Sequence, residues 1–402
     1  MRKTGESGEQ ENLASGSPSN VAYSTASGVT VIPDPDDPDM VIIRTRKRQR
    51  TGRKHARKSR LNPKARVALI VVAVIVGLLA AAGIALAIAV HVGNVNLHQV
   101  VPSAFGDTET LPSQTSVQNE GQIVEYKGHT YKYNENVVSF LLIGHDDESS
   151  FATRPDASCA DIDALFTLDT STNKVKVIVV PRNSWVPVDL YDSNGNYVVT
   201  RNLQLTLSHA VLLPTIAQCA ANTTKSVSRV FYNLPITYYV DIDQDVVKDA
   251  TRAVGGVQVE ALETIPGAGY EAGETVLLEG DSAMKYVQYR NIDVFESALD
   301  RQARQVQFVK AFANKLSNLN PQGIINLYNS VSSGVTTNLG APEIAYLASC
   351  FVAGDNSQLE VSSLTGRTEV AVESDGIEYE RYYLDNESVM ENTLAAFYTQ
   401  VD

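Results

Sequence analysis

The longest hydrophobic segment of the chain is an uncharged run of 24 residues, Val67 to Val90. At about 1.5 Å per residue, a helix of this length crosses the roughly 30 Å hydrocarbon core of a bilayer. The alternative is a buried helix of a soluble domain, but such helices are rarely apolar on every side. The pattern therefore predicts one transmembrane helix over residues 67–90.

Beyond residue 120, short β-prone runs are separated by turn residues. The segment around Gly128 is predicted to form a hairpin, and the apolar run at 137–144 a buried strand that ends in glycine. Residues 163–169 and 175–181 are predicted to be two further strands. The polar sequence between them is typical of a turn, so these two strands are expected to form a hairpin.

Apolar positions recur at helical spacing in the C-terminal half. The pattern predicts helices over 246–254, where Gly255 and Gly256 end the segment, over 282–289 and over 299–316. The C-terminal tail is predicted to contain two strands and a closing helix. Strands mixed with helices in this way indicate a layered α/β domain.

Composition and charge divide the chain around the hydrophobic run. Residues 1–66 are rich in small polar and charged residues, so we expect a disordered tail. Between Arg44 and Arg66 there are twelve lysine or arginine residues and no acid. A basic run can bind nucleic acid, but basic residues this close to a span stay on the cytoplasmic side and attract anionic membrane lipid. Residues 91–120 are then predicted to be an extracytoplasmic stalk, and residues 121–402 a folded extracytoplasmic domain.

The segment after the span is strongly acidic. It holds 19 lysine and arginine residues against 39 acids, a net charge of −20. Nucleic acid is therefore excluded as a ligand of this domain, because phosphate backbones require a positive surface. All three cysteines lie here, so two of them could oxidise outside the cytoplasm. The spacing of cysteine and histidine does not predict a zinc site.

Three acids stand where strands begin or end. Asp146 follows the strand at 137–144, whereas Asp161 and Asp163 begin the next strand. Carboxylates grouped at strand ends can hold Mg²⁺, which prefers oxygen ligands and bridges to substrate phosphates. Ordinary loop acids are the competing interpretation, and spacing alone favours it.

Basic residues in the same domain offer the complementary chemistry. Arg182 follows a predicted strand, Arg290 follows a predicted helix, and Arg301, Arg304 and Gln305 share one helix face. Arginine binds phosphate through two parallel hydrogen bonds, so these residues are candidates for a phosphate site. Surface salt bridges remain the alternative. A catalytic triad of Ser184 with His145 and His209 is disfavoured, because no G-x-S-x-G sequence surrounds the serine.

Taken in order, eight motifs resemble those of the LytR-CpsA-Psr family of bacterial cell-envelope proteins. They extend from Phe140 to Phe312 and are FLLIGHD (140–146), CADIDALFTLD (159–169), VIVVPRNSWV (177–186), LQLTLSHA (203–210), LPITYYVDID (234–243), AVGGVQV (253–259), LLEGDSAMKYVQYR (277–290) and LDRQARQVQFVKAF (299–312). Each motif is weak alone, but their common order is specific.

The resemblance implies a three-layer α/β/α sandwich with an apolar cavity for a polyprenyl tail. It implies a phosphotransferase that moves a glycopolymer from an undecaprenyl pyrophosphate carrier to peptidoglycan, with Mg²⁺ or Mn²⁺. Asp146 and Asp161 would then be the metal-side acids, and Arg182, Arg290, Arg301 and Gln305 would hold the pyrophosphate. Asp163 stays an alternative to Asp161, because two ways of aligning the motif select different acids. A Cys159–Cys219 disulfide is a further expectation.

The chain departs from the family pattern at several of these positions. Asn183 replaces an acid that could orient Arg182, Gln288 replaces an arginine, and Thr206 occupies the polar position of the central motif. Two other functions therefore stay open: a polyprenyl pyrophosphate phosphatase, and a degenerate lipid-binding scaffold without catalysis. Transcriptional regulation is disfavoured, because only the basic tail would face the cytoplasm and it has no helix-turn-helix pattern.

Overall fold

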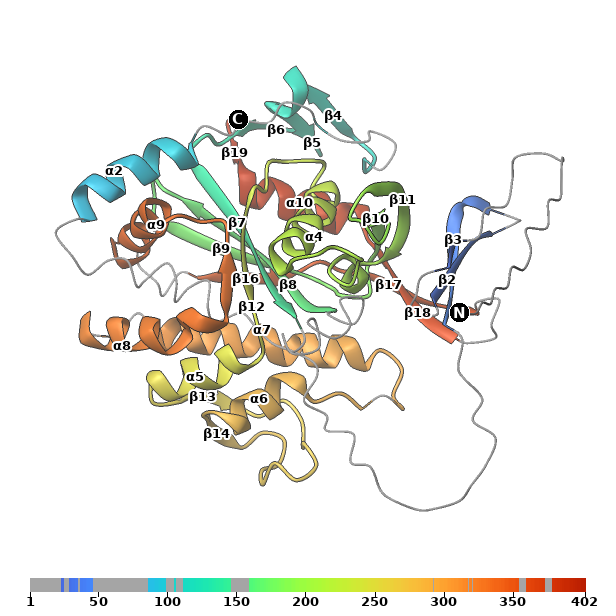
Figure 1. Ribbon diagram of the computed structural model, residues 1–402. Coiled ribbons are helices and arrows are strands. Elements are labelled where there is room, and N and C mark those ends of the chain that lie inside the picture. The colour runs from blue at the N-terminus through green and yellow to red at the C-terminus, as the bar shows by residue number, and fades with distance from the viewer. Residues whose placement is uncertain are drawn as a thin grey trace, which may run out of the picture. The chain divides into compact units, whose positions relative to one another are not determined.

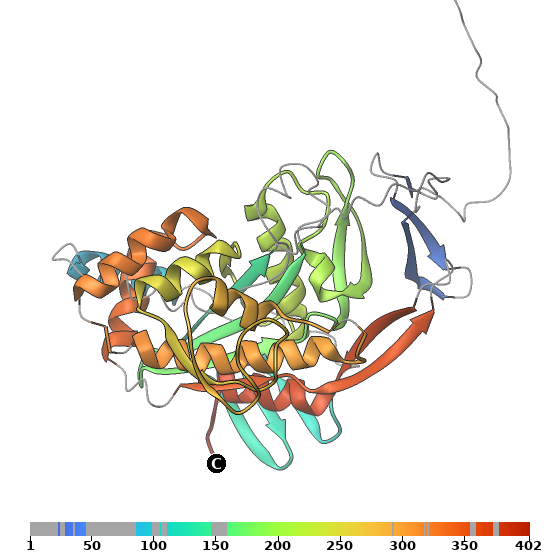
Figure 2. The same cartoon turned by 90° about the horizontal axis from the view of Figure 1, so that it is seen from below.

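In the computed structural model (Figures 1 and 2), the chain divides into two units, residues 1–53 and 54–402. The structure describes residues 23–24, 29–34, 37–45, 86–98, 105, 111–145, 159–291, 293–316, 318–319, 321–353, 359–372 and 378–402. The first unit contains a three-stranded antiparallel sheet of β1 (Tyr23–Ser24), β2 (Val29–Asp34) and β3 (Asp37–Thr45). Valine and isoleucine recur in β2 and β3, and both residue types favour strands. The expected disorder of the tail stays a prediction.

The second unit is built on a mixed six-stranded sheet of order β15-β12-β7-β8-β9-β16. Strands β7, β8 and β9 run antiparallel in sequence, whereas β12 is parallel to β7 and β16 is parallel to β9. The strand bounds are β7 (Val137–His145), β8 (Ala160–Asp169), β9 (Lys174–Val180), β12 (Tyr238–Ile242), β15 (Val335–Thr337) and β16 (Glu360–Ser363). The predicted buried strand and the predicted hairpin that follows it are both confirmed.

Helices cover both faces of this sheet, so the domain has three layers (Figure 1). Helices α5, α6, α7 and α8 lie on one side, and α4 and α10 lie on the other. Their bounds are α4 (Ile216–Val230), α5 (Asp245–Ala253), α6 (Asp281–Gln288), α7 (Ser297–Leu316), α8 (Pro321–Val331) and α10 (Asn386–Phe397). The helices predicted over 246–254, 282–289 and 299–316 are confirmed as α5, α6 and α7.

The two faces of the sheet differ in chemistry. On β8, Ile162, Ala164, Phe166 and Leu168 alternate into one hydrophobic core with α5 to α8. The intervening residues point to the opposite face, on the side of α4, because side chains alternate along a strand. They include Asp161, Asp163 and Thr167, all buried. We call this second side the polar face.

Helix α4 was not predicted from the sequence, and its composition explains why. Its buried side includes the polar residues Asn222, Thr223, Thr224 and Ser226. The hydroxyls of Thr223, Thr224 and Ser226 each donate a hydrogen bond to the backbone carbonyl four residues earlier. Because the helix satisfies these groups internally, a polar sequence can be buried without an apolar stripe.

A four-stranded sheet of order β19-β6-β5-β4 lies beside the domain's C-terminus (Figure 1). It consists of β4 (Thr115–Gln118), β5 (Ile123–Tyr126), β6 (His129–Tyr133) and β19 (Tyr398–Gln400). The β5–β6 hairpin turns at Gly128, whose φ of +85° favours glycine, as expected. The expected stalk boundary at residue 120 falls inside this sheet, because β4 pairs with β5.

Two further hairpins and a helix pair complete the unit. Strands β10 (Trp185–Tyr191) and β11 (Tyr197–Gln204) form one hairpin, and β17 (Gly366–Val372) and β18 (Glu378–Leu384) form the second. The second hairpin and α10 confirm the predicted C-terminal tail. Helix α2 (Leu86–Leu97) packs on α9 (Ala341–Ala353), where the amide of Asn96 donates to Glu343 at 2.7 Å.

The predicted membrane span lies largely outside the described residues. Residues 67–85 fall there, and only Leu86 to Val90 belong to helix α2. Among the helices of the described residues, none has both the length and the apolar character needed to cross a bilayer.

Candidate active site

Several chain segments meet at one end of the central sheet. Because β8 is antiparallel to both β7 and β9, its first residues lie beside the last residues of those two strands. Strand β12 is parallel to β7 and ends at the same place. The segment Pro181–Ser184 follows β9 directly. A short 3₁₀ helix, η4 (Leu205–Ser208), also reaches this end, since its first two backbone amides donate to Ser184 and Arg182.

Asp161 is the acid that meets the arginines. Its buried Oδ1 pairs with a guanidinium nitrogen of Arg182 and lies 3.4 Å from Nη2 of Arg301. Both arginines are at least nine-tenths buried, and Arg301 comes from α7, 140 residues away in sequence. The second carboxylate oxygen of Asp161, Oδ2, has no hydrogen-bond partner among the described residues. The predicted grouping of an acid with two arginines is therefore present.

Asp163 lies on the same face but has different surroundings. The residue is completely buried, and neither carboxylate oxygen has a hydrogen-bond partner within the described part of the chain. Burial, together with the negative charge of Asp241, raises its pKa well above the ordinary value. Of the two alternatives left by the sequence, Asp161 is the one paired with arginine.

Arg290 lies at the rim of the same region and is half-buried. Its Nε donates to the Ser297 hydroxyl at 2.9 Å, and Nη2 lies 3.3 Å from Oε2 of Glu380. Glu380, on β18, also accepts from the side-chain amide of Asn183 at 3.3 Å. A carboxylate from a distant hairpin thus stands beside Asn183, where the family usually carries an acid.

Arg304, expected to bind pyrophosphate, has protein partners in this structure, so that role stays a prediction. Its guanidinium is buried, pairs with Glu263 and donates to the backbone carbonyls of Tyr286 and Tyr289. Burial lowers its pKa to about 10. Gln305 is buried too, and its amide donates to the carbonyl of Val287 at 3.3 Å. Helix α7 is buried on more than one side. Helical spacing along the sequence therefore could not distinguish Arg301, which reaches Asp161, from Arg304, which binds neighbouring backbone carbonyls.

Two further expectations concern Asp146 and the cysteines. Asp146 lies outside the described residues, so its predicted role as a metal-side acid stays a prediction. The Cys159–Cys219 disulfide is wrong: all three cysteines are described, and none forms a disulfide. Cys219 is buried in α4, where burial raises the pKa of its thiol to about 12.

Thr206 positions the arginine–carboxylate group from η4. Its hydroxyl donates to the backbone carbonyl of Ala160 at 2.6 Å, and its backbone amide donates to the carbonyl of Arg182 at 2.9 Å. One residue thus links the strand start that carries Asp161 to the segment that carries Arg182. Thr206, the polar residue of the central motif, is therefore hydrogen-bonded to both Ala160 and Arg182.

A buried cluster of His145, His209 and Asp241 was missed as a unit. Nδ1 of His145 lies 2.7 Å from Oδ1 of Asp241, and Nε2 of His209 lies 2.8 Å from Oδ2. Burial alone would raise the pKa of Asp241, but the two imidazoles outweigh it and hold this pKa at about 2. The sequence feature that could have indicated this cluster is Asp241, an acid within the otherwise apolar β12 sequence YYVDI.

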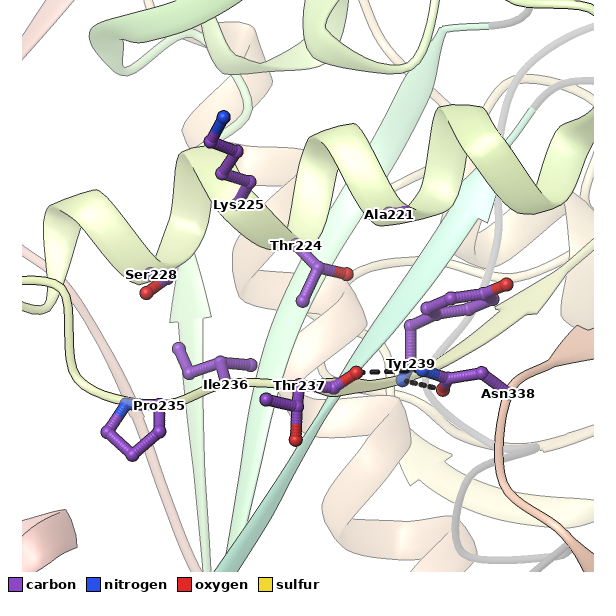
Figure 3. A pocket seen from close by; sticks show the side chains of 9 residues that line it. All are labelled: Ala221, Thr224, Lys225, Ser228, Pro235, Ile236, Thr237, Tyr239 and Asn338. Atoms are coloured by element: carbon purple, nitrogen blue, oxygen red, sulfur yellow. Dashed lines mark hydrogen bonds between the residues drawn. The ribbon is translucent and has the colours of Figure 1, made fainter. Parts of the chain in front are cut away.

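A separate hollow of about 250 Å³ lies between α4 and the start of β12 (Figure 3). Asn338 holds the backbone at its floor, donating to the carbonyl of Thr237 at 2.7 Å and accepting from the amide of Tyr239 at 2.9 Å. The residues that line it are Ala221, Thr224, Lys225, Ser228, Pro235, Ile236, Thr237, Tyr239 and Asn338. The apolar cavity expected for a polyprenyl tail stays a prediction.

Comparison with known proteins identifies the family. The LytR_cpsA_psr family model matches residues 105–396, about three quarters of the chain, and the chain belongs to this family. The fold agrees with that assignment, since the crystal structure of TagV from Bacillus subtilis superposes with a TM-score of 0.51 at 21% identity. That match covers 65% of this chain and 95% of the other.

Two curated relatives show the range of similarity. The polyisoprenyl-teichoic acid--peptidoglycan teichoic acid transferase TagU of Bacillus mycoides is 27% identical over 206 residues, which is 50% of this chain and 60% of the relative. The corresponding TagV transferase of Bacillus subtilis is 22% identical over 293 residues, 70% of this chain and 68% of the relative. The chain therefore spans about 60% of the length of the TagU proteins that it matches.

Proposed function

We propose that this chain is a phosphotransferase that attaches a cell-wall glycopolymer from an undecaprenyl pyrophosphate carrier to peptidoglycan. The observation that carries the proposal is the buried Asp161 in contact with Arg182 and Arg301. An acidic domain has no evident structural need for two buried guanidinium groups on one carboxylate. Guanidinium groups bind phosphate oxygens through parallel N–H donors, which suits a pyrophosphate ligand. The names of the TagU and TagV relatives, both teichoic acid transferases, support the same reaction class.

The proposed chemistry is positioning and charge stabilisation. A hydroxyl of peptidoglycan attacks the phosphorus that carries the glycan, and the bond between the two phosphates breaks. Undecaprenyl phosphate leaves with the bonding electron pair, and the hydroxyl proton passes to solvent. Arg182 and Arg301 neutralise charge that develops on the phosphate oxygens, and their burial strengthens this effect. Arg290, which pairs with Glu380, would contact the substrate from the rim.

A divalent cation, Mg²⁺ or Mn²⁺, belongs to this proposal. The donor set fits, since Oδ2 of Asp161 is buried and has no hydrogen-bond partner in the described part of the chain. Such an oxygen is costly to bury alone and is the ligand type that Mg²⁺ prefers. Asp161 and Asp146 would hold the ion, which when bound would neutralise pyrophosphate charge. The protein's own contribution is to orient Asp161 through Arg182, Arg301 and Thr206.

The proposed location is the outer face of the cell membrane, with the N-terminus cytoplasmic. The proposal rests on the apolar run at 67–90 and the basic run before it. Helix α2 takes up residues 86–90, which leaves the 19 apolar residues 67–85. At about 1.5 Å per residue these would extend roughly 28 Å, close to the thickness of a hydrocarbon core. The domain would then lie next to its lipid-linked substrate.

The test combines the full chain, in detergent, with a polyprenyl pyrophosphate-linked saccharide, peptidoglycan fragments and Mg²⁺. Mass spectrometry is expected to detect a glycan–phosphate–peptidoglycan adduct, which disappears in Asp161→Asn and Asp146→Ala. Arg252→Ala removes an exposed arginine of α5 and serves as the matched control. Free phosphate released without an acceptor would instead identify a phosphatase. Bound lipid with no adduct and no phosphate would identify a scaffold.

A further inference from the structure

The cluster of His145, His209 and Asp241 has the composition of a transition-metal site. Each side chain offers one ligand atom, and these atoms all lie within 4.8 Å of one another. All three residues are almost completely inaccessible to solvent. They come from three segments, the end of β7, the residue after η4, and β12, so 96 residues separate the first from the last. Cysteine and histidine spacing along the sequence could not have indicated such a site.

The donor atoms distinguish this cluster from the proposed Mg²⁺ acids. Two imidazole nitrogens and a carboxylate suit zinc and the neighbouring divalent transition metals, whereas Mg²⁺ takes oxygen ligands. A hydrogen-bonded His–Asp–His group is the simpler interpretation, and it accounts for Asp241. It does not account for a second buried carboxylate nearby.

That second carboxylate is Asp163. Asp163 and Asp241 are both paired in register with Ile143 and lie on the two strands that flank β7. Their side chains therefore point to the same face. Asp163 is completely buried and has no hydrogen-bond partner among the residues that the structure describes. Two buried carboxylates that were both ionised would need compensating positive charge, and a single dication would provide it.

We propose that His145, His209 and Asp241 bind one divalent transition-metal ion of the zinc class, with Asp163 beside it as a charge-balancing group. The ion connects the ends of β7 and β12 to His209, the residue that follows η4. Thr206 lies in η4 itself. Zinc lies about 2.0–2.2 Å from such ligands, so tetrahedral ligand atoms stand roughly 3.4 Å apart. Each imidazole nitrogen therefore moves away from the Asp241 oxygen that it contacts at 2.7 or 2.8 Å when the ion binds. The donor set differs from that of the proposed Mg²⁺ acids, and this inference does not depend on the proposed function.

The experiment uses the full chain, freed of metal by a chelator and kept in excess Mg²⁺ so that oxygen-only sites are filled. Zn²⁺ is titrated by calorimetry, and Co²⁺ by its visible absorption. We expect one equivalent of either ion. His209→Gln and Asp241→Asn are expected to weaken Zn²⁺ binding by at least about 100-fold, because even outer-shell changes cost roughly 10–100-fold. His129→Gln, at an exposed histidine paired with Asp402, is the matched control and retains full affinity.

X-ray absorption of the zinc-loaded wild type gives a second measurement that needs no variant to fold. Two imidazole nitrogens in the first shell are expected. The proposal is overturned by a wild type that takes up no stoichiometric Zn²⁺, by binding that survives in both cluster variants, or by a shell of oxygen alone. None of these results involves glycopolymer transfer, so a failure of the proposed transferase would be recognised separately.

Discussion

The two faces of the central sheet carry the same backbone but opposite chemistry. On one face, alternate residues of β7, β8, β9 and β12 pack into a continuous apolar core with α5 to α8. On the polar face, the same strands present His145, Asp161, Asp163 and Asp241, all buried. The first face is apolar throughout, whereas the second holds charged groups away from water, at a cost in folding free energy, among buried apolar residues such as Leu141 and Leu165. Substitutions on the two faces should therefore separate stability from activity.

The largest effect is expected on the apolar face, at Phe166. Its ring is buried and stacks on Phe140, with centroids 5.0 Å apart. Phe166→Ala should lower the free energy of unfolding by about 3–5 kcal/mol, because it removes buried surface and leaves a cavity. Urea unfolding measures this loss, and Leu262→Ala at a half-exposed position is the control. Transfer activity per folded molecule should not change. A large loss of activity in the folded fraction would contradict the separation of the two faces.

Arg182→Ala is the matching change on the polar face. We expect the transfer rate to fall about 10²–10³-fold, the usual effect of removing one preorganised donor to developing charge. The rate is followed by adduct formation under saturating substrate, beside Arg252→Ala. A reduction below tenfold would mean that Arg182 only neutralises Asp161 and does not act on the substrate.

Asp163→Asn tests whether the polar face costs stability. Because the folded pKa of Asp163 is raised above its unfolded value of about 3.9, the wild type loses stability as pH rises from that value through the folded pKa. The asparagine variant lacks this loss, so its stability relative to wild type should increase with pH. Thermal unfolding from pH 4 upward, with a chelator present, measures the difference.

A second carboxylate provides the control of opposite sign. Hydrogen bonds from Asn196 lower the pKa of the exposed Asp192. Its contribution is present above the unfolded pKa and is lost as pH falls, so Asp192→Asn should lose stability at neutral pH and approach wild type in acid. If both variants showed the same pH trend, burial would not be the cause at Asp163.

The smallest effect is expected at Thr206. Thr206→Val keeps the shape of the side chain but removes the 2.6 Å hydrogen bond to Ala160, at a cost of about 1 kcal/mol of unfolding free energy. Transfer activity should fall more than this loss explains, because Asp161 follows Ala160 directly. Thr206→Ser preserves the hydroxyl and should restore both quantities. Restored stability without restored activity would assign the methyl group, and not the hydrogen bond, to positioning.

Local pattern determined much of the fold. The apolar runs at 137–144, 163–169 and 175–181 formed β7, β8 and β9, and helical periodicity located α5, α6 and α7. The order of the motifs was enough to indicate the family. These features depend on neighbours along the chain, so periodicity and turn residues report them directly. Helix α4 escaped because hydrogen bonds within the helix, which no periodicity reveals, allowed it to bury polar residues.

Only the tertiary structure decided which side chains meet. Arg301 and Arg304 stand one turn apart on α7, yet the first reaches Asp161 and the second anchors the backbone at Tyr286. Asp161 and Asp163 share a face of β8, and the positions of Arg182, Arg301 and Asp241 distinguish them. The histidine–aspartate cluster depends on the register between β7 and β12. The physical reason is that sequence spacing fixes a residue's place on its own element, whereas contacts between elements are fixed by register and packing.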